Sequence, residues 1–232
     1  MMVRLAQAAF KQRRMFREGP MLEQPLKFFV VFFVVVEPIS LVPLFSGLTR
    51  GATQEYRRRM AVKAIAVAAI ILVLFALGGA PFLAVMGISL AAFRIFGGVL
   101  LFLLALEMVF ARESGSRTSS DERAESRRRA DISVFPVAFP FIAGPGALAT
   151  VLLWFGPVHI AHRPMTFLLL LAAVAAVLVI TLVMMLLAEP LMHFMGVTGV
   201  NVTGRLLGVV LGALAVQFVI DGLRAAFLVK PG

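Results

Sequence analysis

The chain has 232 residues, of which 61% are hydrophobic and 15% are charged, and its mean hydropathy is +0.99. Soluble domains are about 45–50% apolar and about 25% charged, so the composition indicates an integral membrane protein with room for about six helices of roughly 20 residues. The net charge of +10 does not indicate a nucleic-acid-binding protein because the basic residues lie between apolar spans, and the absence of cysteine excludes disulfides, thiol redox chemistry and thiolate metal sites.

The apolar segments divide the chain into two halves. Residues 1–20 form a basic tail, for which the alternatives are a short basic surface helix, an unstructured segment, or sequence that precedes a translation start at Met21. Residues 21–110 form the first half, residues 111–131 a flexible charged linker, and residues 132–232 the second half. The predicted spans are residues 25–45, 62–83, 90–110, 132–155, 164–188 and 203–228, and the Gly78-Gly79-Ala80-Pro81 cluster is expected to end the second.

The loops between spans predict the orientation. The loops after the first, third and fifth spans hold most of the arginines and lysines, among them Arg57, Arg58, Arg59 and Arg112. The positive-inside rule therefore predicts that these three loops are cytoplasmic.

Two spans contain helix-breaking residues in matching positions. The first span carries Glu37-Pro38 and the fourth carries Gly144-Pro145-Gly146. Proline removes a helical hydrogen bond, and a freed backbone group at membrane depth must face protein or a wet cavity. Interrupted helices at equivalent places in two halves are typical of a transporter's binding site. The alternative is that these prolines only kink the helices for packing.

The two halves also resemble each other. Residues 80–88 match residues 189–197, Pro38 matches Pro145, and residues 94–97 match residues 205–208, all at nearly the same separation. Because each half has an odd number of spans, the second half must enter from the opposite side, which predicts an inverted-topology repeat. The alternative is two similar hydrophobic hairpins that match by chance.

The breaks supply the candidate site residues. Glu37 is the carboxylate that lies deepest within a span, and it could titrate a proton, contact a substrate ammonium or cap the half-helix that follows it. The half-helix expected to start at Gly146 presents N–H groups and a positive dipole end that suit a carboxylate, and the half-helix ending near Ala143 presents carbonyls that suit an ammonium group or a cation. A small zwitterion therefore fits such a site. The predicted substrate-binding residues are Glu37, Pro38, Ser40, Gly144, Pro145, Gly146 and Ala147, with Thr150 as a further hydroxyl and Glu37 also as the proton-coupling residue.

Enzyme motifs are missing from the sequence. It has no His-Glu-x-x-His, no phosphate-binding glycine loop and no Gly-x-Ser-x-Gly nucleophile elbow. We therefore expect no catalytic residues, no cofactor and no metal site. The pair His159 and His162 is a weak metal signal, and an interfacial role is favoured because no third ligand lies nearby.

Three motifs carry a resemblance to a known family: DISVFPVAFPFIAGPGA at residues 131–147, EPISLVPLF at residues 37–45 and ALAVQFVIDG at residues 213–222. Together they resemble the MarC-like family of bacterial inner-membrane proteins, which belongs with the LysE-type exporters. The resemblance implies a multi-pass inner-membrane protein of six helices in two inverted repeats. It also implies, through the SnatA-type members, proton-coupled transport of small neutral amino acids such as glycine and alanine.

This chain departs from the family's first-span motif at two positions. Asp or Asn usually precedes the proline where Glu37 stands, and Gly usually stands at Ser40. The larger side chains can shrink the site or change its proton affinity. We therefore expect an amino-acid transporter in the lipid bilayer with no nucleic-acid partner, and the alternative is a non-transporting membrane scaffold or assembly factor.

Overall fold

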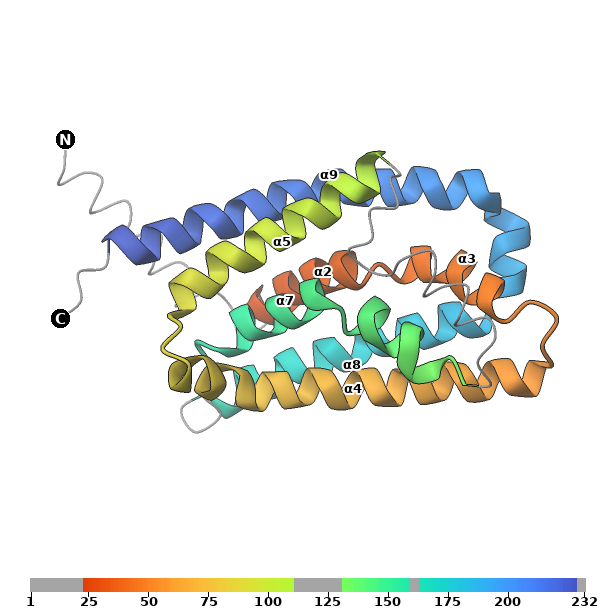
Figure 1. Cartoon of the computed structure of the whole chain (residues 1–232), viewed down its shortest axis with the longest axis horizontal. Coiled ribbons are helices and arrows are strands. Elements are labelled where there is room, and N and C mark those ends of the chain that lie inside the picture. Colours follow the sequence, from red (N-terminus) through yellow and green to blue (C-terminus); the bar gives the residue numbers. More distant parts are fainter. Residues whose placement is uncertain (1–22, 111–130, 159–162, 229–232) are drawn as a thin grey trace.

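The computed structural model describes residues 23–110, 131–158 and 163–228, and all regular elements within them are helical. Figure 1 shows an elongated bundle in which the helices run along its long axis. The predicted tail and nearly all of the predicted linker lie outside the described residues. The elements are α2 (Glu23–Val36), α3 (Pro38–Leu48), α4 (Gln54–Val85), α5 (Leu90–Phe110), the π-type helix η1 (Ser133–Ile142), α7 (Pro145–Phe155), α8 (Pro164–Leu186) and α9 (Ala188–Leu228).

The helices are long enough to cross a membrane several times. Five candidate spans occur in the described part of the chain, the first formed by α2 and α3 together. A sixth is obtained if η1 and α7, which meet at a bend of 55°, are counted as one span. The all-helical membrane fold expected from composition is thus confirmed, and α5 has the predicted bounds.

The prediction that the Gly78–Pro81 cluster ends the second span is wrong. α4 continues through these residues to Val85, with Pro81 inside the helix. Gly79 is buried against α7, where a Cβ atom would lie 2.8 Å from Leu152 Cδ1. The cluster therefore permits close packing between helices, and membrane helices tolerate proline because their neighbours satisfy the freed backbone groups.

The sixth span begins a few residues earlier than predicted, at Thr198 instead of about Thr203, and the helix that contains it begins earlier still. α9 begins at Ala188, and Gly196 divides it into two helical parts with φ 62° and ψ 177°. Glycine adopts this backbone conformation at little cost because it has no Cβ. The membrane-spanning part is Thr198–Phe227. In the first half, Gly87 matches Gly196 in the sequence and also has a positive φ, of 69°.

The two halves of the chain interlock. α2 and α3 pack against α8, whereas η1 and α7 pack against α4. In the same way, α3 contacts α9 and α7 contacts α5. Each half's first span therefore lies on helices of the other half, and Figure 1 shows α2 and α7 inside the bundle.

α5 and α9 form the most extensive helix pair (Figure 1). A Cβ atom at Gly98 in α5 would lie 2.8 Å from the carbonyl oxygen of Ala215, and one at Gly208 in α9 would lie 3.2 Å from that of Ala105. Early residues of α5 thus meet late residues of α9, so the helices are antiparallel. Glycine at both contacts lets the backbones approach closely, as is common between membrane helices.

Aromatic side chains join three helices in the interior. The Phe155 ring of α7 meets the ring of Phe28 in α2 at 5.8 Å and that of Phe167 in α8 at 5.0 Å, both edge to face. Such pairs stabilise beyond the area they bury. Large apolar side chains such as Leu74 and Leu206 are exposed on the outer surface, as expected for helices that face lipid.

Two ion pairs place three loops at one end of the bundle. Lys63 of α4 pairs with Asp131, just before η1, and Arg57 of α4 pairs with Glu189 at the start of α9. The chain segments before the second, fourth and sixth predicted spans therefore lie on the same side. This agrees with the grouping of basic loops predicted from the sequence.

Candidate functional site

The first break is centred on Glu37. α2 ends at Val36 and α3 begins at Pro38, and between them Glu37 has left-handed φ and ψ values of 54° and 60°. Its N–H still donates to the Phe33 carbonyl at 2.9 Å. A left-handed conformation at a residue other than glycine is uncommon and costs about 1–3 kcal/mol, so the surrounding structure must hold Glu37 in place.

The Glu37 carboxylate is buried with Ser40. Glu37 is 3% exposed, and its Oε1 accepts a hydrogen bond from the Ser40 hydroxyl. The side chain makes no capping hydrogen bond to the amides of α3. The structure therefore does not support the capping alternative and places the carboxylate beside a hydroxyl.

The second break is held by backbone contacts at Gly144. Phe139 is extended because the residue before a proline is disfavoured in the helical region, and η1 is irregular here. A Cβ atom at Gly144 would lie 2.1 Å from the Pro140 carbonyl oxygen, so only glycine fits. Pro145 follows as the first residue of α7.

The start of α7 has backbone donors without helical partners. The first hydrogen bond of the helix runs from Leu148 N to the Gly144 carbonyl at 3.0 Å. The N–H groups of Gly146 and Ala147 lie before it and therefore have no acceptor within α7. The Thr150 hydroxyl donates to the Gly146 carbonyl at 2.8 Å, so this predicted hydroxyl contact is directed to its own helix.

A cavity of about 150 Å³ lies at the second break. Its wall is formed by residues of the second break and by leucines of α5. Val35 of α2 is the residue of the first span that lines it. The lining residues are Val35, Leu100, Leu103, Leu104, Pro140, Phe141, Gly144, Pro145, Gly146 and Ala147.

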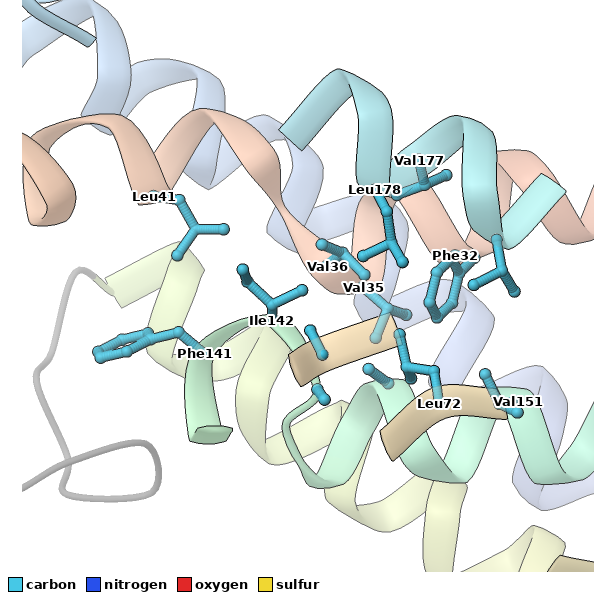
Figure 2. Packing of buried hydrophobic residues seen from close by; sticks show 14 of the residues in the cluster. Phe32, Val35, Val36, Leu41, Leu72, Phe141, Ile142, Val151, Val177 and Leu178 are labelled. Carbon is cyan, nitrogen blue, oxygen red and sulfur yellow. The ribbon is translucent and has the colours of Figure 1, made fainter. Parts of the chain in front are cut away.

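The structure brings the two breaks close together but separates their polar groups. A Cβ atom at Gly146 would lie 3.4 Å from Val35 Cγ1. Glu37, Pro38 and Ser40 do not line the cavity. Figure 2 shows Val36 and Leu41, on either side of Glu37 in the sequence, near Ile142 in the apolar interior. The predicted site residues thus form two groups, one that lines the cavity and one around the Glu37–Ser40 pair.

The Glu37 group has a further neighbour that the sequence did not reveal. A Cβ atom at Gly204 in α9 would lie 3.3 Å from Glu37 Oε1 and 3.6 Å from Ser40 Oγ. No motif marks Gly204, which is one of 19 glycines in the chain. His159 and His162 lie outside the described residues, and within those residues no cluster of three or more potential metal ligands occurs.

Comparison with known proteins gives the family. The model of the MarC family integral membrane proteins matches residues 22–227. This chain belongs to the MarC family. It is 30% identical to the UPF0056 membrane protein YhcE of Escherichia coli, with 87% of this chain and 92% of the relative covered.

Other MarC relatives agree with this assignment. The chain is 35% identical to the UPF0056 membrane protein YvbG of Bacillus subtilis, over 86% of this chain and 93% of that protein. It is 33% identical to a UPF0056 membrane protein of Aquifex aeolicus, over 86% and 92%. No solved structure matches the chain. The protein is therefore a multi-pass membrane protein, as expected for the inner membrane.

Proposed function

We propose that this MarC family protein is a secondary transporter of small neutral amino acids that alternates access by moving two inverted repeats against each other, with proton coupling at Glu37. The observation that carries the proposal is Glu37 itself. A carboxylate that is 3% exposed within an apolar span, in a strained left-handed conformation, is costly to keep. Intramembrane ionisable residues commonly mark ion and substrate pathways.

The contacts between the halves support the inverted repeat. Gly98 of α5 contacts Ala215 and Val219 of α9. Gly208 of α9 makes the corresponding contact with Ala105 and Val109 of α5, and these residues match the first set at one separation along the chain. A contact in which each partner repeats the other's role is what a two-fold axis produces. The positive φ values at Gly87 and Gly196 and the matching Pro38 and Pro145 at helix starts fit the same relation.

The two breaks supply complementary chemistry for a zwitterion. The N–H groups of Gly146 and Ala147, at the positive end of the α7 dipole, suit a carboxylate. Glu37, with the Ser40 hydroxyl, suits an ammonium group or a proton. In the proposed cycle the repeats bring both groups to one substrate, and in the conformation described here only Gly146 and Ala147 line the cavity.

The test is uptake of labelled glycine and alanine into proteoliposomes with an imposed pH gradient. We expect the wild-type protein to concentrate an amino acid when the gradient is present and Glu37→Gln to lose this coupling. Glu189→Gln is the matched control, because Glu189 is 64% exposed and pairs with Arg57 at the end of the bundle. Unchanged coupling in Glu37→Gln removes Glu37 from the mechanism, and no gradient-dependent uptake of any neutral amino acid refutes the proposal.

One observation favours a second function, a non-transporting membrane scaffold. Val36 and Ile142 lie in the buried apolar cluster beside the breaks, and Glu37 is paired with Ser40 and does not line the cavity. A thermal-shift screen of the purified protein against amino acids separates the two functions, since a ligand that binds only the folded state raises the melting point. A scaffold predicts no shift with any of them.

A further inference from the structure

The Glu37–Ser40 pair is closed by a backbone surface. Gly204 lies across the pair at a distance where a Cβ atom would contact both polar atoms. Gly204 is itself buried, and α3 and α9 are in extensive contact. Because Gly204 has no side chain, the backbone of α9 itself covers the Glu37 carboxylate on this side.

α9 also has a point about which it can turn. Gly196 interrupts the helix with φ 62° and ψ 177°, two turns before Gly204, and nothing lies within 4 Å of a Cβ atom placed there. Hinges are residues that absorb a large change in φ and ψ at the end of an element. The membrane-spanning part of α9 starts at Thr198, two residues after Gly196.

We infer that Gly204 is the positioning residue that seals the Glu37–Ser40 pair, and that a proton or ammonium group reaches the carboxylate when the spanning part of α9 turns away from α3 about Gly196. This inference rests on the proposed function for its ligand, but the seal itself is a property of the fold. A methyl group at Gly204 would be 3.3 Å from Glu37 Oε1, closer than ordinary van der Waals contact, so the Glu37–Ser40 pair and α9 must move apart by a few tenths of an ångström.

The experiment measures access to Glu37 without requiring transport. The purified full chain in nanodiscs is treated with N,N′-dicyclohexylcarbodiimide, a membrane-soluble reagent for carboxyl groups, and modification of Glu37 is followed by mass spectrometry. We expect Gly204→Ala to raise the initial rate of modification about tenfold, a factor that corresponds to about 1.4 kcal/mol. Gly212→Ala is the matched control, because its methyl would meet Ala105 Cβ at an ordinary 3.6 Å on the same helix.

A second variant keeps the test decisive if Gly204→Ala does not fold. The natural chain has no cysteine, so Ser40→Cys combined with Gly204→Cys provides a single disulfide between α3 and α9. We expect modification of Glu37 to be slow in the oxidised protein and faster after reduction.

The outcomes separate the seal from the transporter. The inference is overturned if folded Gly204→Ala is modified at the same rate as the wild type or as Gly212→Ala. It is also overturned if the oxidised and reduced forms of the double variant are modified at equal rates. If the rates change as expected but no amino acid is taken up, the seal stands and the proposed transport function fails. If uptake is coupled to protons but the rates do not change, the transporter stands and the seal fails.

Discussion

The contact between α5 and α9 provides a sharp test of the packing argument. A methyl group at Gly98 would lie 2.7 Å from Val219 Cγ2, 2.8 Å from the Ala215 carbonyl oxygen and 3.0 Å from Val219 N. Two of these atoms are backbone and cannot rotate away, so Gly98→Ala must force the helices apart. Overpacking of this kind costs about 1–3 kcal/mol.

The same pair offers an internal control. A methyl group at Gly212 would meet Ala105 Cβ at 3.6 Å, an ordinary contact, and alanine is the better helix former by about 1 kcal/mol. Both variants gain this propensity, so Gly98→Ala should have a thermal midpoint roughly 2–12 °C below that of Gly212→Ala, given about 2–4 °C per kcal/mol for a chain of this size. Gly212→Ala should leave the wild-type midpoint unchanged or raise it.

The assay is thermal unfolding of each purified variant in the same detergent. Gly208→Ala belongs in the series, because its methyl would lie 2.8 Å from Met108 Cβ and 3.2 Å from the Ala105 carbonyl oxygen. The proposed two-fold relation predicts a loss similar to that of Gly98→Ala. A Gly98→Ala midpoint equal to that of Gly212→Ala would refute the close-packing argument, and a neutral Gly208→Ala would contradict the symmetry.

Three further predictions concern the breaks and the end of the bundle. Gly144→Ala should strongly reduce the yield of folded protein in size-exclusion chromatography, because its methyl would collide with the Pro140 carbonyl oxygen, and a normal yield contradicts this. Gly146→Ala should fold, since its methyl meets the side chains of Leu101 and Val35, but should weaken amino-acid uptake about tenfold; wild-type uptake would remove Gly146 from the site. Hydrogen bonds from Lys63 and Ser133 lower the pKa of Asp131 from 3.8 to about 2, so its stabilising effect is present above pH 3.8 and is lost as the pH falls toward 2. Melting curves of the wild type and Asp131→Asn should therefore differ near neutral pH and converge near pH 2, and a constant difference would contradict the assignment.

The sequence allowed the membrane class and much of the fold to be predicted. Apolar runs of the right length identified the spans, and the bounds of α5 were predicted correctly because Gly87 precedes it and the charged segment follows it. Pro38 marked the helix start at the first break, and at the second break the helix begins at Pro145, one residue before the predicted Gly146, since proline is favoured at the first helical position. The Gly78–Pro81 cluster was misleading because neighbouring helices let α4 continue through it, and hydropathy did not indicate that α9 begins at Ala188.

What the sequence alone determined is the local chemistry: where backbone hydrogen bonds must break, and that Glu37 lies within apolar surroundings. Only the tertiary structure decided which groups meet. It set Gly204 of α9 against Glu37 and Ser40, and it gave the cavity at Gly146 a wall of leucines from α5. The physical reason is that contacts between helices depend on their rotation and crossing, which side chains distant in the sequence fix together by packing.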